Sequence, residues 1–138
     1  MREINEITGE VVDAAYLLHT RLGPGLVESA YRLVLMADLE RRGLRVEQEK
    51  PISFQYEGIS IVNGFRVDLL VENRVVVELK SLERLAPVHT RQVLTYLRLL
   101  DLPIGLLINF GAARLDDGLQ RVVNKRSSLA PISIVPSR

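Results

Sequence analysis

The spacing of apolar residues predicts two helices at the start of the chain. From residue 4 to residue 22 such residues recur at every third or fourth position: Ile4, Ile7, Val11, Ala14, Leu18 and Leu22. This period is typical of a helix that buries one stripe of its surface. A second helical pattern runs from about residue 26 to residue 42, after the breaker Gly23-Pro24-Gly25. We therefore expect two successive helices, the second ending at Gly43, a residue type that favours a C-terminal cap.

Beyond Gly43 the pattern changes to that of strands. Short strands separated by turn-forming residues are expected at 44–48, 51–56 and 59–62. The dipeptides Glu57-Gly58 and Asn63-Gly64 carry the turn signals. Two longer apolar runs follow, FRVDLLV at 65–71 and RVVVELK at 74–80. They are predicted to form a hairpin.

One more helix and two further strands complete the pattern. Pro87 opens a helix over residues 88–100, whose inward-facing residues are expected to be Val93, Leu94, Leu97 and Leu100. The continuous apolar run IGLLINF at 104–110 is typical of a buried strand, and another strand is expected at 119–123. The helix can make the crossover between the hairpin and a parallel strand at 104–110. We therefore expect an α/β fold with a mixed sheet.

Charged residues interrupt the two apolar runs of the predicted hairpin. A three-residue loop at 72–74 sets a register in which Asp68 lies opposite Glu78. In the same register Arg66 lies opposite Lys80. Because side chains alternate with period two, all four are expected on one face. Two carboxylates that close repel each other unless a cation lies between them.

The residue types of this hairpin suit a site for a hard metal ion. Asp68 and Glu78 supply oxygen ligands of the kind that Mg²⁺ and Mn²⁺ prefer. Such an ion can polarise a phosphoryl group and lower the pKa of a bound water, and Lys80 could neutralise charge that builds up on a phosphate. The alternative is a surface hairpin in which Asp68 forms a cross-strand ion pair with Arg66 or Lys80.

Polar residues on two of the predicted helices are further candidates. Gln92 and Tyr96 lie one turn apart on the helix at 88–100 and could hydrogen-bond phosphate oxygens or an attacking water. The alternative is that both are ordinary polar residues on the outer side of a packed helix. Glu28 lies at the start of the second helix, where an acidic residue interacts favourably with the helix dipole. This interaction alone is enough to explain an acidic residue at this position.

Composition excludes several classes of site. The chain has 138 residues, 47% of them hydrophobic and 25% charged, and we expect a single domain over residues 1–138. The absence of cysteine and the presence of only two histidines exclude disulfides, thiolate zinc sites and a three-histidine zinc site within one chain. No apolar stretch is long enough for a membrane span, so no membrane association is expected. The lack of cysteine fits a cytoplasmic location.

Charge and the C-terminal tail bear on partners. The net charge is only +1, so the composition does not indicate a broad basic surface for binding nucleic acid. An enzyme can nevertheless concentrate its positive charge in one cleft. The tail is apolar at Leu129, Ile132, Ile134 and Val135. It could pair with another subunit to form a homo-oligomer, or pack on its own core.

Five blocks of the sequence resemble one protein family. GLVESAY at 25–31 matches the Gly-x-x-Glu-x-x-Tyr pattern that names the GxxExxY proteins. The runs GFRVDLLV, VVVELKS, HTRQVLTYL and GLLINFG resemble further blocks of that family in the same order, so the likeness spans about residues 5–125. The family belongs to the PD-(D/E)xK nuclease superfamily. The resemblance therefore implies an α/β fold with a three-layer, restriction-endonuclease-like core (αβββαβ), a mixed central sheet and an extra N-terminal helix.

The resemblance also implies a role for the charged candidates. Asp68 is similar to the motif aspartate, and Glu78 and Lys80 are similar to the acidic residue and the lysine of the E-x-K element. Glu28 resembles an acidic residue of the first core helix that completes the metal site with Asp68 and Glu78. The chain departs from the pattern at Val67, where the superfamily name has proline.

The same resemblance implies an activity. Gln92 and Tyr96 are similar to a Q-x-x-x-Y element that helps to position the substrate and the metal site. The implied protein is a nuclease that depends on Mg²⁺ (or Mn²⁺) and hydrolyses phosphodiester bonds of nucleic acid, with DNA as the expected substrate. The alternative is a non-catalytic nucleic-acid-binding or protein-interaction module on the same fold.

Overall fold

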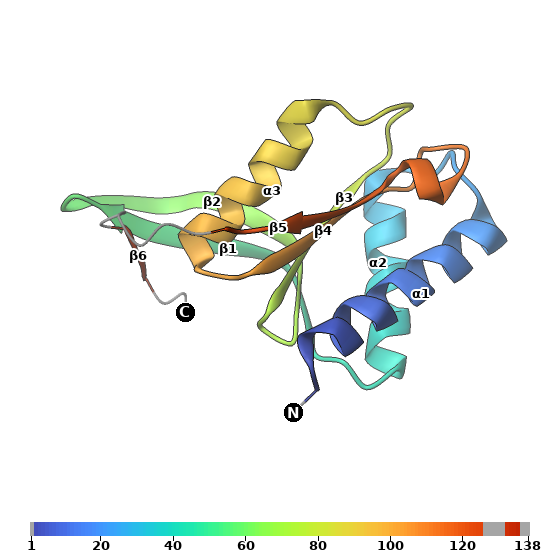
Figure 1. Ribbon diagram of the computed structural model, residues 1–138, viewed down its shortest axis with the longest axis horizontal. Coiled ribbons are helices and arrows are strands. Elements are labelled where there is room, and N and C mark those ends of the chain that lie inside the picture. The colour runs from blue at the N-terminus through green and yellow to red at the C-terminus, as the bar shows by residue number, and fades with distance from the viewer. Residues whose placement is uncertain (1, 126–131, 136–138) are drawn as a thin grey trace.

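The helices and strands form three layers, with α1 and α2 together on one side of the sheet and α3 on the other (Figure 1). The computed structural model describes residues 2–125 and 132–135. The elements in chain order are α1 (Ile4–Leu22), α2 (Glu28–Arg41), β1 (Val46–Tyr56), β2 (Ile59–Val71), β3 (Val75–Lys80), α3 (Pro87–Leu100), β4 (Ile104–Asn109), a 3₁₀ turn (Leu115–Asp117), β5 (Leu119–Val123) and β6 (Ile132–Val135).

The sheet has six strands in the order β5-β4-β3-β2-β1-β6. Neighbouring strands are antiparallel except β3 and β4, which are parallel and which α3 connects. The predicted α/β fold with a mixed sheet and an extra N-terminal helix is confirmed. Strands β3 and β4 lie inside the sheet and are covered on both faces, which explains their nearly continuous apolar sequence.

Apolar side chains form one core on each face of the sheet. The core on the α1 and α2 side includes Ile7, Val11, Tyr31, Leu35, Leu69, Val77 and Phe110. The core on the α3 side consists of Ile52, Val67, Leu70, Val76, Val93, Leu97, Leu107 and Val122. Val93 and Leu97 of α3 are one helical turn apart and fully buried. Both residues therefore face the core, as their spacing in the sequence predicts. None of the helices among the described residues is long and apolar enough to cross a bilayer.

The strand boundaries predicted between residues 44 and 64 are partly wrong. Strands β1 and β2 each run without a break, and only the turn at Glu57-Gly58, where both residues have positive φ, joins them. Asn63 also has a positive φ, 49°, but it lies within β2. There the register with β1 shifts between the β1 residues Ile52 and Phe54. Asn-Gly favours the left-handed backbone conformation, and this conformation serves a β-bulge as well as a turn.

The hairpin of β2 and β3 begins in the predicted register. Val71 pairs with Val75 and Leu69 pairs with Val77, where the ladder ends. The predicted opposition of Arg66 and Lys80 is not observed, because the ladder ends before it reaches them, and Arg66 is exposed.

The alternation of β2 breaks close to Asp68. Val67 and Leu70 both contact the core on the α3 side, although they are three residues apart and regular alternation would place them on opposite faces. Glu49 of β1 lies between the pairs Gln48–Leu69 and Lys50–Val67, and its φ is 46°. The regular strand geometry is therefore interrupted at the level of Asp68.

The C-terminal tail contributes the edge strand β6. Its residues 132–135 pair with β1, with Ile134 opposite Phe54 and Ile132 opposite Tyr56. Of the apolar tail residues noted in the sequence, Leu129 lies outside the described residues. The backbone pairing places part of the tail on the sheet of its own chain.

Candidate functional site

Asp68 and Glu78 meet where the ladder between β2 and β3 ends. The backbone N–H of Asp68 donates a hydrogen bond to Glu78 Oε1, 3.0 Å away. In return, the backbone N–H of Leu79 donates to Asp68 Oδ2, 2.8 Å away. Each carboxylate thus binds the backbone of the opposite strand, where a regular ladder would place carbonyl oxygens. This exchange fixes both side chains next to each other.

The environment of Glu78 favours its neutral form. Its side chain is buried, with 3% of the residue exposed, while Asp68 is half-buried. Burial, followed by the negative charge of Asp68, raises the pKa of Glu78 from 4.5 to about 8, and the backbone hydrogen bond and Lys80 only partly oppose this. A cation placed between the two carboxylates would remove this repulsion.

Glu28 and Lys80 lie beside this pair. Glu28 begins α2, and burial, followed by the charge of Asp68, raises its pKa, while Lys80 and Arg32 lower it. Lys80 is the last residue of β3 and forms no ion pair with a carboxylate of the described residues. Three acidic side chains and one lysine therefore interact electrostatically at this place: Glu28, Asp68, Glu78 and Lys80.

Tyr31 holds the loop that leads into Glu28. Its hydroxyl donates to Gly23 O at 2.5 Å and accepts from the backbone N–H of Leu26 at 3.2 Å. Its ring stacks on Phe110, with the ring centroids 4.6 Å apart. Gly25 has a φ of 115°, which is strained for residues with a side chain. These contacts explain why glycine and tyrosine flank Glu28 at this spacing.

Asn109 holds the chain that follows Lys80, a role that was not predicted from the sequence. Asn109 Oδ1 accepts from the backbone N–H of Leu82 at 2.9 Å and from that of Gly111 at 3.1 Å. Asn109 Nδ2 donates to Leu82 O at 2.9 Å. The available signal was a single amide at the end of the apolar run 104–110, where a buried polar group needs partners.

Tyr96 reaches the site from the α3 side. It is half-buried and stacks on Phe65 of β2, with the ring centroids 4.4 Å apart. Burial, followed by the charges of Glu78 and Asp68, raises the pKa of its hydroxyl. Gln92 is one turn earlier on α3 and is exposed. The structure thus places Tyr96 close to the carboxylates and Gln92 at the surface.

One comparison with known proteins identifies the family of the chain. A family model described as the PD-(D/E)XK nuclease superfamily matches residues 5–122. The chain belongs to this superfamily. Neither the comparison with curated proteins nor the comparison with solved structures finds a match. Like other members of the PD-(D/E)XK superfamily, the chain has a restriction-endonuclease-like αβββαβ core, and Asp68, Glu78 and Lys80 appear in the order that the superfamily name spells.

PD-(D/E)XK nucleases usually use divalent metals, and the donor set of this chain fits such an ion. A carboxylate has two oxygens, so Asp68 and Glu78 can each accept their backbone hydrogen bond and still offer an oxygen to a cation. Mg²⁺ keeps several waters and takes only one or two carboxylates from protein. Among the described residues no three histidine or acidic side chains form a group that could hold a metal ion. Glu28 therefore lies near the pair without joining it in such a group.

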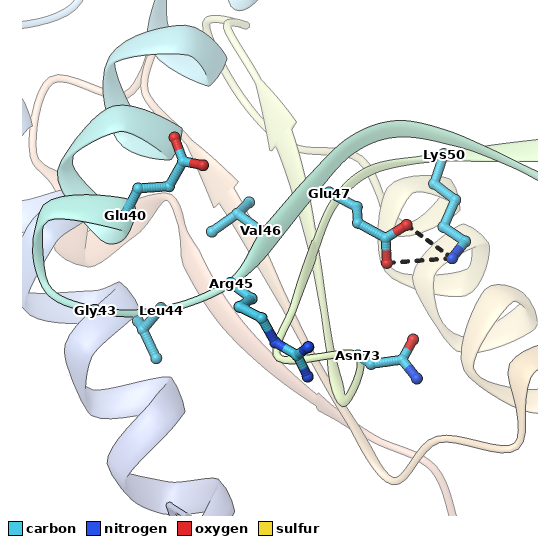
Figure 2. Close-up of a pocket in the computed structure, with 8 residues that line it drawn as sticks. All are labelled: Glu40, Gly43, Leu44, Arg45, Val46, Glu47, Lys50 and Asn73. Carbon is cyan, nitrogen blue, oxygen red and sulfur yellow. Dashed lines mark hydrogen bonds and ion pairs between the residues drawn. The ribbon is translucent and has the colours of Figure 1, made fainter.

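An open hollow of about 780 Å³ lies at a different place on this PD-(D/E)XK domain, where α2 ends and β1 begins (Figure 2). Arg45, Glu47, Lys50 and Asn73 are among its lining residues. Three of its ionic side chains already have partners, since Lys50 binds Glu47 at 2.9 Å and Arg45 lies 3.9 Å from Glu72. None of the candidate residues lines this hollow.

Proposed function

We propose that the protein is a metal-dependent nuclease that hydrolyses phosphodiester bonds of nucleic acid, with DNA as its substrate and Mg²⁺ or Mn²⁺ as its cofactor. The observation that carries the proposal is the reciprocal bonding of Asp68 and Glu78 beside Lys80, in a chain of the PD-(D/E)XK nuclease superfamily. Two adjacent carboxylates, one of them buried, repel each other when both are ionised, and a bound cation would relieve this repulsion.

Asp68 and Glu78 would hold the metal, and Glu28 would add a third negative charge beside them. A divalent ion at this place supplies an activated water and polarises the scissile phosphate. The rigid backing of β2 and β3 keeps the two carboxylates in position before substrate arrives.

Lys80, Tyr96 and Gln92 would act on the nucleic acid. Lys80 has no competing ion pair within residues 2–125, so its ammonium is free to stabilise the negative charge that grows on the phosphate. The pKa of Tyr96 is raised, so its hydroxyl stays protonated and can donate to a phosphate oxygen or orient the attacking water. Gln92, exposed one turn away, would contact the backbone of the substrate.

The test is cleavage of labelled single-stranded DNA, double-stranded DNA and RNA with Mg²⁺, with Mn²⁺ and with EDTA. The wild type should cleave DNA only with metal, and Asp68→Asn should be inactive. Asp13→Asn makes the same chemical change at an exposed position of α1 and should remain active. Binding of nucleic acid that EDTA does not alter, without cleavage of any substrate, would instead indicate a non-catalytic binding module.

A further inference from the structure

A series of hydrogen bonds connects β4 to the loop that precedes α2. Asn109, at the end of β4, binds both the N–H and the C=O of Leu82. The neighbouring residue Ser81 donates through its hydroxyl to Leu26 O, 2.6 Å away. Ser81 directly follows Lys80, and Leu26 lies two residues before Glu28. The bond therefore joins the two segments that carry Lys80 and Glu28.

The loop between α1 and α2 is exposed where it leads into Glu28. Its residues Leu26 and Val27 are 42% and 69% exposed, and within residues 2–125 no side chain caps the start of α2. The hydroxyl of Tyr31 also binds this loop, at Gly23 O and at the N–H of Leu26. Leu26 is thus held at its carbonyl by Ser81 and at its N–H by Tyr31.

We propose that Ser81 and Tyr31 are positioning residues that set Glu28 against Asp68 and Lys80. The inference rests on the proposed function, because it concerns the same site. Catalytic groups must keep their places to within about 0.5 Å. Glu28 comes from a helix and Lys80 from a strand that is remote in sequence, so their separation depends on the bonds that join these two segments.

Removal of the Ser81 hydroxyl is the direct test. Ser81 is only half-buried, so Ser81→Ala should fold normally. We expect kcat and the affinity for Mn²⁺ alone to fall on the order of tenfold, the lower end of the effect of removing groups that orient metal ligands. Ser81→Thr keeps the hydroxyl and should recover most of both. Ser29→Ala, the same change at an exposed position next to Glu28, should have no effect.

A double-mutant cycle shows whether Ser81 acts through Glu28. Ser81→Ala is measured in the wild type and again in Glu28→Gln. If the hydroxyl serves to place Glu28, Ser81→Ala should lower kcat and the affinity for Mn²⁺ hardly at all once Glu28 has been replaced. An equal loss in both backgrounds, or no loss in either, would overturn the proposal. Tyr31→Phe, which keeps the stacked ring, should behave in the cycle like Ser81→Ala.

Hydrogen exchange separates failure of this inference from failure of the proposed function. A wild type that neither binds Mn²⁺ nor cleaves nucleic acid would refute the nuclease proposal. The positioning bonds would still be measurable, because Ser81→Ala should speed amide exchange at residues 25–28 while the exchange of β3 stays unchanged. Unchanged exchange at residues 25–28 would show that Ser81 does not hold this loop.

Discussion

Asp68 and Glu78 each accept a hydrogen bond from the strand of the other: Glu78 Oε1 from the N–H of Asp68, and Asp68 Oδ2 from the N–H of Leu79. The backbone ladder between the two strands ends at the pair Leu69–Val77, and beyond it each carboxylate accepts from an amide of the opposite strand. The same side chains are therefore needed both for local structure and for the proposed metal site. Substitutions here must be chosen so that these two effects can be separated.

The first prediction concerns pH. The pKa of Glu78 is about 8 in the folded protein and 4.5 without the fold. Between these values the folded protein retains a proton that the unfolded chain has lost, so the unfolding free energy falls as pH rises from 4.5 towards 8. The stabilisation is complete below 4.5 and lost above about 8.

Urea unfolding at pH 5, 6.5 and 8 measures this effect. Glu78→Gln keeps an acceptor for the N–H of Asp68 but cannot titrate, so the difference between wild type and variant isolates the contribution of Glu78. Relative to the variant, the wild type should lose stability steadily over this range, since one pKa unit corresponds to about 1.4 kcal/mol. A constant difference would contradict the raised pKa.

The second prediction separates structure from chemistry at Asp68. Asp68→Ala leaves the N–H of Leu79, a fully buried residue, without its acceptor and should cost about 1–3 kcal/mol. Asp68→Asn retains an acceptor oxygen and should cost less than about 1 kcal/mol. Guanidinium unfolding of both variants provides the comparison. Equal destabilisation would show that the bond to Leu79 contributes little.

The third prediction concerns Lys80. Its charge lowers the pKa of Glu78 and of Glu28, so Lys80→Met should raise both. Under the proposed function, single-turnover cleavage with saturating Mn²⁺ should slow by about 10²- to 10³-fold, the usual effect of removing one group that stabilises transition-state charge. Lys125→Met, at an exposed residue outside the site, serves as the control. Cleavage by Lys80→Met at the wild-type rate would remove Lys80 from the mechanism.

The fourth prediction compares two glycines. A Cβ on Gly111 would lie 2.3 Å from Leu82 O and 2.5 Å from Leu82 N, so Gly111→Ala must displace the backbone that follows Lys80. A Cβ on Gly9, within α1, would meet nothing within 4 Å. Gly9→Ala should therefore raise stability by about 0.5–1 kcal/mol, while Gly111→Ala lowers it by more than that. Thermal unfolding of both variants decides the matter, and a neutral Gly111→Ala would contradict the tight packing against Leu82.

Patterns with a fixed period were sufficient to predict most of the fold. The apolar stripe of α3 and the three-residue loop at 72–74 are local features, and the loop sets the register in which Asp68 approaches Glu78. The Asn63-Gly64 dipeptide was misread because its left-handed conformation suits a bulge as well as a turn. Local sequence does not distinguish these two outcomes, since pairing with β1 decides between them.

The supporting residues of the site could not be predicted in this way. The bond from Ser81 to Leu26 joins positions that are 55 residues apart. The bonds from Asn109 to Leu82 span 27 residues. Neither contact leaves a periodic signal, because each depends on how α2 and β4 pack against the end of β3.

Calorimetric titration of Mn²⁺ into wild type, Asp68→Asn and Asp13→Asn, with DNA cleavage followed in the same samples, tests the central proposal most directly. Wild type and Asp13→Asn should bind the ion and cleave DNA, whereas Asp68→Asn should stay folded and do neither. A folded wild type that binds no Mn²⁺ and leaves DNA intact, or an Asp68→Asn variant that binds Mn²⁺ as tightly as the wild type, would contradict this proposal.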